Sequence, residues 1–220
     1  MIDLSTSGDV AVLIMESGEN RLSPELLDAF DTALDSIEKM PSPRALVTVG
    51  SGKFFSNGLV QDQWDLHSAE GGRYVSRVGR LYARLLTLPM ITVAAVNGHA
   101  YGAGAMLALS HDLRVMRSER GYFCLPEANI GLPFSPGMQA LIQGRLGPAT
   151  SHEAMLTSRT YTAEQAFAAG IVHHIADGSR VLSLAIETAA EHTAKDGAVV
   201  AEIRSQLQAP AIEGLTRLSS

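Results

Sequence analysis

One acidic side chain stands among apolar neighbours that would change its chemistry. Glu127 lies in the segment from Tyr122 to Phe134, most of whose residues are hydrophobic. Burial among such residues strips water from a carboxylate, which raises its pKa and makes it a stronger base near neutral pH. The same pattern also fits a helix-capping or surface glutamate on a loop. The segment therefore indicates a candidate general base and leaves the ordinary interpretation open.

Two glycine-containing segments can each present a free backbone N–H group. The first runs from Phe54 to Leu59 and the second from Asn97 to Ala105, and each separates a predicted strand from a predicted helix. The start of a helix exposes N–H groups that have no partner within the helix, and the helix dipole adds partial positive charge there. Two such loops side by side can direct two N–H groups at one oxygen, as an oxyanion hole requires. Taken singly, each loop also fits an ordinary tight turn.

Other arrangements of reactive residues are weaker. The second loop departs from the dinucleotide-binding pattern because Leu107 occupies its third glycine position. The run Ser110 to Asp112 holds a serine, a histidine and an aspartate, but adjacent residues do not give the geometry of a hydrolytic triad. His173 and His174 are consecutive in a predicted strand, so their rings point to opposite faces, and we expect no metal site.

Composition limits the kinds of protein that this chain can be. The 220 residues are 46% hydrophobic and 18% charged, which fits a globular domain with a real core. The net charge of −6, without a dense run of Lys and Arg, argues against a nucleic-acid partner. The single cysteine, Cys124, cannot form an internal disulfide, and the first residues show no signal or transit pattern. We therefore predict a cytoplasmic protein.

One long stretch without Asp, Glu, Lys or Arg has to be placed. Leu85 to Ser110 is long enough to span a membrane as a single helix. Pro89, the pair Asn97-Gly98 and Gly102 interrupt it. We therefore predict buried elements joined by a tight turn and no membrane span.

The elements that must position these residues alternate along the chain. Strands are predicted over residues 10–15, 45–49, 91–96, 113–116 and 171–175. Helices are predicted over residues 26–40, 74–86, 105–109, 163–169, 179–195 and 199–207, with residues 98–104 as a loop. The Thr162 to Gln165 segment is a capping box, and Gly170 is the matching helix stop. Strands that alternate with helices imply parallel crossovers, hence an α/β domain.

The two loops and the Pro-Glu-x-x-x-Gly segment from Pro126 to Gly131, in this order, resemble the crotonase (enoyl-CoA hydratase/isomerase) superfamily. The resemblance runs from about Asp9 to His174. The segments 54–59 and 124–134 are most similar to single-domain Δ3,Δ2-enoyl-CoA isomerases. The resemblance implies a ββα spiral over residues 1–175 and a shortened C-terminal helical segment over residues 176–220. It also implies a homotrimer or a dimer of trimers.

The resemblance assigns roles to individual residues. It places an oxyanion hole on the backbone N–H groups of Leu59 and Ala103, which would polarise a thioester carbonyl. Arg21 would meet the phosphates of coenzyme A, although it also fits a solvated loop charge. Trp64 and Phe134 would wall the acyl pocket, or belong to the plain core. The full set expected to bind acyl-CoA is Arg21, Ser56, Asn57, Gly58, Gly102, Trp64 and Phe134.

One departure from the hydratase pattern narrows the expected reaction. Hydratases of this superfamily use two glutamates, and the first of these positions is Met106 here. Methionine cannot hold or activate water, whereas the single carboxylate of Glu127 suffices to move a proton between two carbons. The resemblance therefore implies a Δ3-to-Δ2 enoyl-CoA isomerase of unsaturated fatty acid β-oxidation, with no metal and no cofactor beyond its substrate's coenzyme A. Thioester hydrolysis, weak hydration and a non-catalytic acyl-CoA-binding role stay open.

Overall fold

The computed structural model describes residues 1–40, 44–60, 65 and 68–217, and its largest layer is a six-stranded sheet. β1 and β2 form an antiparallel hairpin, and the other neighbouring strands are parallel, as predicted for an α/β domain. In spatial order the strands are β1 (Ile2–Ser7), β2 (Val10–Met15), β3 (Ala45–Gly50), β5 (Ile91–Val96), β7 (Leu113–Arg117) and β9 (His174–Ala176).

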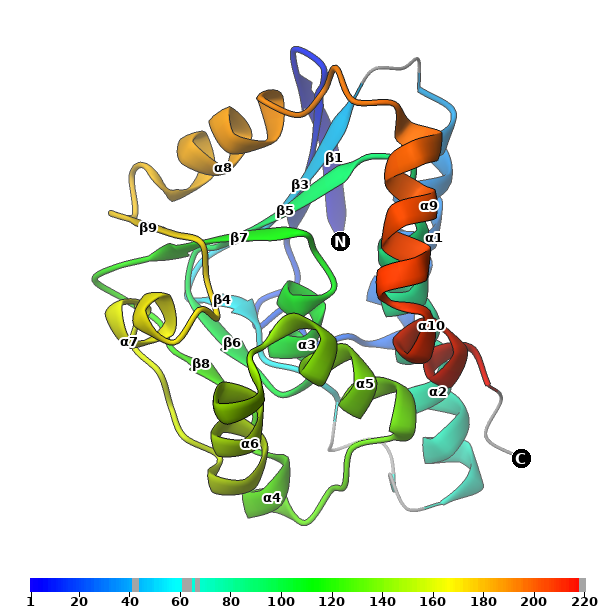
Figure 1. The fold of residues 1–220 in the computed structure, drawn as a ribbon, viewed down its shortest axis with the longest axis vertical. Coiled ribbons are helices and arrows are strands. Elements are labelled where there is room, and N and C mark those ends of the chain that lie inside the picture. Colours follow the sequence, from blue (N-terminus) through cyan, green and yellow to red (C-terminus); the bar gives the residue numbers. More distant parts are fainter. Residues whose placement is uncertain (41–43, 61–64, 66–67, 218–220) are drawn as a thin grey trace.

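A second sheet of three short parallel strands lies beside the first (Figure 1). It consists of β4 (Phe54–Ser56), β6 (His99–Tyr101) and β8 (Phe123–Cys124). Each of them directly follows a strand of the large sheet along the chain, so the fold advances by repeated strand–strand–helix turns. The prediction of a loop over residues 98–104 was wrong at β6. Three residues are too few to show a period, and their order comes from hydrogen bonds to neighbouring segments, such as Ala100 N–H to Tyr122 O at 2.9 Å.

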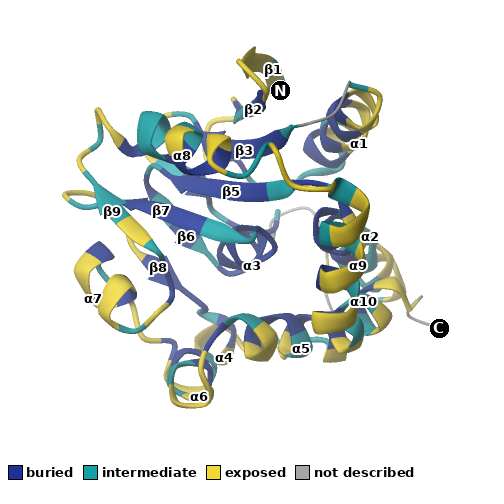
Figure 2. Cartoon of the chain, turned by 45° about the horizontal axis from the view of Figure 1, so that its top comes forward, coloured by how far each residue is buried: buried dark blue, intermediate teal, exposed yellow. Residues whose placement is uncertain are grey.

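Helices cover both faces of the large sheet (Figure 2). α8 packs its Val181 and Ala185 on one face, against Val12 and Val47 among others. α1, α2 and α3 pack on the opposite face. The helices are α1 (Pro24–Glu38), α2 (Ala69–Thr87), α3 (Ala103–Leu109), α4 (Glu127–Ile130), α5 (Pro136–Arg145), α6 (Pro148–Thr157), α7 (Ala163–Ala168), α8 (Val181–Ala190), α9 (Gly197–Leu207) and α10 (Ala209–Thr216).

Local signals in the sequence set several helix ends as predicted. The Ser23 side chain accepts a hydrogen bond from Leu26 N–H at the start of α1, where Pro24 occupies the first position. The capping box of Thr162 and Gln165 opens α7. Gly170 follows that helix with a φ of 71°, a left-handed conformation that glycine adopts without strain.

The last third of the chain departs most from the predicted ranges. The strand expected over residues 171–175 is β9, which begins only at His174, and the helix expected over 179–195 ends at Ala190. Helix α10 was not predicted at all. It packs against α5 through glycines, since a Cβ on Gly214 would lie 2.6 Å from Gly137 Cα. Within the part of the chain that the structure describes, every helix is too short or too polar to span a bilayer.

An ion pair between buried Arg204 and partly buried Asp112 fastens α9 to the core. Arg204 of α9, which is 4% exposed, donates from Nε and Nη2 to the two carboxylate oxygens of Asp112 at 2.8 and 2.7 Å. The same guanidinium donates to Leu88 O at 2.6 Å and to Met90 O at 2.7 Å, just beyond the end of α2. One side chain thus joins α9, the end of α2 and the turn after α3.

We expect Arg204→Met to lower the free energy of unfolding by about 3 kcal/mol, because it removes a cation from the partly buried Asp112 carboxylate and the donors to the Leu88 and Met90 carbonyls. Urea unfolding at neutral pH measures this change. Arg180→Met is the matched control, since Arg180 is exposed and pairs with Glu187 only at the surface, where such a pair is worth about 1 kcal/mol or less. Equal losses in the two variants would contradict the anchoring role of Arg204.

Candidate active site

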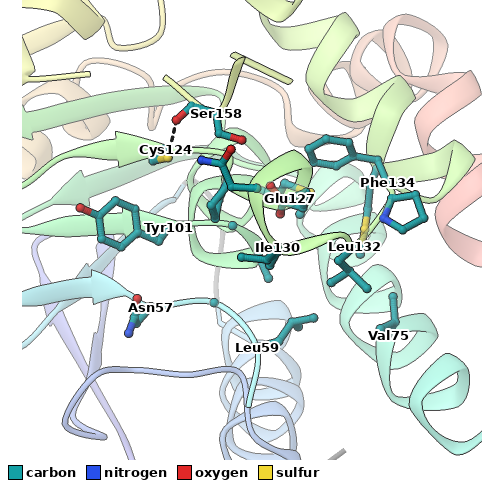
Figure 3. A pocket seen from close by; sticks show the side chains of 18 of the residues that line it. Asn57, Leu59, Val75, Tyr101, Cys124, Glu127, Ile130, Leu132, Phe134 and Ser158 are labelled. Atoms are coloured by element: carbon teal, nitrogen blue, oxygen red, sulfur yellow. Dashed lines mark hydrogen bonds between the residues drawn. The ribbon is translucent and has the colours of Figure 1, made fainter. Parts of the chain in front are cut away.

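A cavity of about 640 Å³ opens where the short strands end. Its wall comes from the segments after β4 and β6, from α2, and from the chain between β8 and α5. Figure 3 shows Glu127 near its middle, with Asn57, Tyr101 and Ser158 toward one side and Val75 and Phe134 toward the other. The cavity therefore has a polar end and an apolar end on either side of one carboxyl group.

Glu127 owes its position to a single helical turn. Pro126 precedes α4, and Gly131 ends it with a φ of 68°, so the turn closes within four residues. The Glu127 side chain is directed into the cavity rather than into solvent, and the residue is only 5% exposed. Among the described residues, no hydrogen-bond donor reaches its Oε2 atom. One oxygen of this buried carboxyl group is thus left without a described protein partner.

This environment changes the acidity of the group. Burial raises the pKa of Glu127 to about 7, and a hydrogen bond from its own backbone N–H opposes that rise. At neutral pH the protonated and ionised forms are therefore similarly populated. A group in that condition can both accept and return a proton. The prediction that apolar neighbours desolvate Glu127 is confirmed.

The first glycine loop uses nearly all of its polar groups to hold its own shape. Asn57 N–H donates to Glu19 O at 2.9 Å, and Gly58 N–H donates to Ser56 Oγ at 3.3 Å. The Gly58 and Leu59 carbonyls accept from Leu22 N–H and from Arg21 Nη1 respectively. No described residue accepts a hydrogen bond from the Leu59 N–H. That group borders the cavity and stays free for a ligand.

The second glycine loop leads from β6 into α3 and lies against the first. Gly102 has a φ of 53°, and a Cβ there would lie 3.2 Å from Glu127 Oε1. A Cβ on Gly58 would lie 3.3 Å from Ala103 N, so the two loops touch with no room for a side chain. Ala103 opens α3, and no described residue accepts a hydrogen bond from its N–H. Both loops therefore offer an unpaired N–H beside the same carboxyl group.

The other residues predicted to bind a ligand fall into three groups. Arg21, Asn57, Gly58, Gly102 and Phe134 line the cavity. Ser56 is fully buried beneath the first loop, where its Oγ donates to Asn20 O at 2.6 Å, so its side chain supports the loop rather than facing the cavity. Trp64 lies outside the described residues.

Arg21 has partners within the protein. Its Nη1 donates to Leu59 O at 2.9 Å and its Nε to Glu19 Oε2 at 2.8 Å. The guanidinium thus braces the first loop and is partly neutralised by a carboxylate. Its contact with phosphate groups stays a prediction.

The alternative sites that the sequence offered are occupied by structural contacts. His111 is fully buried, where its Nδ1 donates to Leu107 O and its Nε2 accepts from Thr48 Oγ1. Burial lowers the pKa of His111 to about 4, so the ring stays neutral. His173 accepts a hydrogen bond from Arg114 N–H, whereas His174 is exposed. In the described ranges, no group of three or more His, Cys, Asp or Glu side chains is arranged to hold a metal ion.

Comparison with known proteins agrees with this architecture. The family described as enoyl-CoA hydratase/isomerase matches residues 6–219, almost the whole chain. The chain belongs to the enoyl-CoA hydratase/isomerase family. An enoyl-CoA hydratase from Mycobacterium marinum has the same fold, with a TM-score of 0.89 and 26% identity over 97% of this chain and 94% of that one. The predicted crotonase-like spiral is thereby confirmed.

Two plant proteins of this family are similar in sequence. Enoyl-CoA delta isomerase 1, peroxisomal, of Arabidopsis thaliana is 40% identical over 70% of this chain and 66% of its own length, just under two thirds. Enoyl-CoA delta isomerase 3 of the same plant is 32% identical over 94% of this chain and 92% of its own length. The first name places that relative in peroxisomes, so the cytoplasmic location of this chain stays a prediction.

Several cavity residues of this family member were not predicted. Tyr101 and Ser158 line its polar end and Val75 and Leu132 its apolar end. Tyr101 lies in β6, and the pairing of β6 with β8 places it beside Cys124 on the same face of the small sheet. Ser158 and Leu132 lie on irregular chain after α6 and α4, where no period in the sequence indicates which residues face inward.

Removing the charge of Glu127 should stabilise the fold at high pH. Its folded pKa of about 7 lies above the ordinary glutamate pKa of 4.5, so the folded state loses stability relative to the unfolded chain as pH rises from about 4.5 to 7. We expect Glu127→Gln to exceed wild type by up to about 3 kcal/mol in unfolding free energy at pH 8, and by little at pH 4.5. Urea titrations at both pH values test this, with exposed Glu213→Gln as the control. A difference that does not depend on pH would contradict the raised pKa.

Proposed function

We propose that this family member isomerises 3-enoyl-CoA thioesters to 2-enoyl-CoA thioesters, with Glu127 as the one acid–base group. The observation that carries the proposal is the unpartnered Oε2 of a buried carboxyl group beside the free N–H groups of Leu59 and Ala103. The names of the similar Arabidopsis proteins support isomerisation. The hydratase name of the structural relative keeps hydration as the second candidate.

The proposed reaction moves one proton across three carbons. The Glu127 carboxylate removes a proton from C2 of the 3-enoyl thioester, and the electron pair spreads to the thioester oxygen as a dienolate. The Leu59 and Ala103 N–H groups donate to that oxygen, where each donor is worth about 3 to 4 kcal/mol in the transition state. The protonated Glu127 then gives its proton to C4. The double bond thereby moves from C3–C4 to C2–C3, and the carboxylate is regenerated.

The two ends of the cavity fit the two ends of such a substrate. The apolar end, with Val75, Leu132 and Phe134, would take the acyl chain, since its walls are aliphatic and aromatic. The polar end, with Asn57 and Tyr101, would take the pantetheine arm of coenzyme A. Glu127 lies between them, where the reacting carbons of the thioester would lie. The length of the apolar end of the cavity would set which acyl chains are accepted.

A single carboxyl group favours isomerisation over hydration. Met106 lies at the cavity wall, 2% exposed, in the position where the hydratase pattern has its other glutamate. A thioether is a weak hydrogen-bond acceptor and no base, so it cannot orient a water molecule for attack. Residue 106 therefore cannot activate a water molecule, and hydration assisted by this position does not compete with isomerisation.

The isomerase proposal predicts that Glu127→Gln abolishes turnover and spares binding. Wild-type protein should convert trans-3-hexenoyl-CoA to the conjugated 2-enoyl thioester, followed by ultraviolet absorbance. The variant keeps the shape of the carboxyl group but cannot accept the proton, so we expect kcat to fall at least about 10³-fold. Calorimetry with hexanoyl-CoA should give similar Kd values for both proteins. Absence of conjugated product from wild type that binds hexanoyl-CoA would refute isomerisation.

The role of Met106 can be tested by restoring the other carboxyl group. We expect wild type to show no hydration of 2-hexenoyl-CoA, and Met106→Glu to gain measurable hydration while isomerisation slows. The new carboxylate would also raise the pKa of Glu127, since two carboxylates in one site disfavour each other's ionised form. Met106→Gln is the matched control because it is polar without being basic. Hydration by wild type at a rate equal to its isomerisation would favour the second candidate.

A further inference from the structure

Two buried tyrosines of α2 reach toward the two loops of the site. Tyr74 and Tyr82 are eight residues apart, so they lie on one face of the helix, about 12 Å apart along its axis. Tyr74 is 5% exposed and Tyr82 is fully buried, and both rings belong to the main core. The Tyr74 hydroxyl contacts backbone of the first loop and of Leu22, and the Tyr82 hydroxyl contacts backbone of the second loop.

Tyr74 holds the first loop. Its hydroxyl accepts a hydrogen bond from Val60 N–H at 3.0 Å and donates one to Leu22 O at 2.8 Å. Val60 directly follows Leu59, and Leu22 N–H donates in turn to Gly58 O at 2.8 Å. Tyr74 therefore ties the chain after Leu59 to α2 directly, through Val60, and the chain before Leu59 indirectly, through Leu22 and Gly58.

Tyr82 holds the second loop. Its hydroxyl donates to Ala103 O at 2.6 Å, at the first residue of α3. Burial raises the pKa of Tyr82 well above its ordinary value, and the charge of Glu127 adds to that rise, so the phenol remains a donor throughout the working pH range. Helix α3 has only seven residues, and this contact fixes its first residue from the side of α2.

We propose that Tyr74 and Tyr82 are positioning residues, which use the rigid axis of α2 to set the spacing between the N–H groups of Leu59 and Ala103. The inference rests on the proposed function, because only a shared oxygen gives that spacing a consequence. Two donors stabilise one oxyanion when both lie about 3 Å from it, and a small displacement of either weakens catalysis strongly. Val75, the neighbour of Tyr74, lines the apolar end of the cavity, so the same helix also contacts the acyl chain.

The test measures polarisation of a bound carbonyl group directly. Hexanoyl-CoA labelled with ¹³C at its thioester carbonyl cannot isomerise, and its infrared stretch falls in frequency when donors engage the oxygen. Tyr82→Phe and Tyr74→Phe keep the buried rings and remove one hydroxyl each. Tyr161→Phe is the matched control, because Tyr161 is equally buried and its hydroxyl donates to Glu153 Oε2 at 2.7 Å, away from the cavity.

We expect each of the two α2 variants to lose about half of the frequency shift seen in wild type. Their kcat with trans-3-hexenoyl-CoA should fall about tenfold, while KM and the Kd of hexanoyl-CoA change less than twofold. Tyr161→Phe should keep the full shift and the full kcat. A full shift in both α2 variants, or an equal loss in Tyr161→Phe, would overturn the positioning role. Bound hexanoyl-CoA without any shift in wild type would instead remove the oxyanion hole itself, and the proposed function with it.

Discussion

Ionising a carboxyl group away from water costs free energy, and the acid–base behaviour of Glu127 depends on this cost. Within the part of the chain that the structure describes, no cation offsets this cost, and burial is the largest influence on the pKa of Glu127. The backbone around it has to approach closely to exclude water. Glycine at position 102 permits this approach, since its φ is positive and a Cβ there would crowd the carboxylate at 3.2 Å. The missing side chain at this one position thus helps to enclose the acid.

The free N–H groups of Leu59 and Ala103 also depend on the close packing of the two glycine loops. A loop that exposes one unsatisfied N–H to a cavity must satisfy its other polar groups elsewhere, or it would rearrange to pair them. The first loop does this with Glu19, Ser56 and Arg21, which consume the donors and acceptors on both sides of Leu59. The second loop does it with β8 and Tyr82. Among the described residues, the Leu59 and Ala103 N–H groups are thus left unpaired while neighbouring backbone groups of both loops are hydrogen-bonded.

Sequence patterns anticipated the parts of the molecule that depend on local order. Long apolar runs such as Ile91–Val96 and the capped start of α1 were predicted correctly because propensity and burial agree there. The desolvation of Glu127 followed from its immediate neighbours. The strands β4, β6 and β8 were not predicted because two or three residues show no period, and their pairing joins residues 23 to 45 positions apart.

The cavity walls show the same limit. Leu132 and Ser158 lie on irregular chain, so only the folded backbone decides that they face inward. The family resemblance assigned Arg21 to the phosphates of coenzyme A, and that contact stays a prediction. The structure shows hydrogen bonds from Arg21 to Leu59 O, 38 residues away, and to Glu19, two residues away. A charged residue in a sequence indicates a partner of opposite charge, but the sequence does not show which backbone carbonyl will accept its hydrogen bonds.

The C-terminal helices take part in this arrangement through α2. Arg204 of α9 binds the carbonyls of Leu88 and Met90 at the end of that helix. Leu215 of α10 packs on Gly79, which lies between the two tyrosines in α2. A Cβ on Gly79 would lie 3.1 Å from the Leu215 carbonyl oxygen. Helix α2 is therefore held at its end and along its flank by chain that contributes no residue to the cavity. Because in the proposed arrangement the two loops take their spacing from α2, the rigidity of the site depends on α9 and α10, although these helices supply no reacting group.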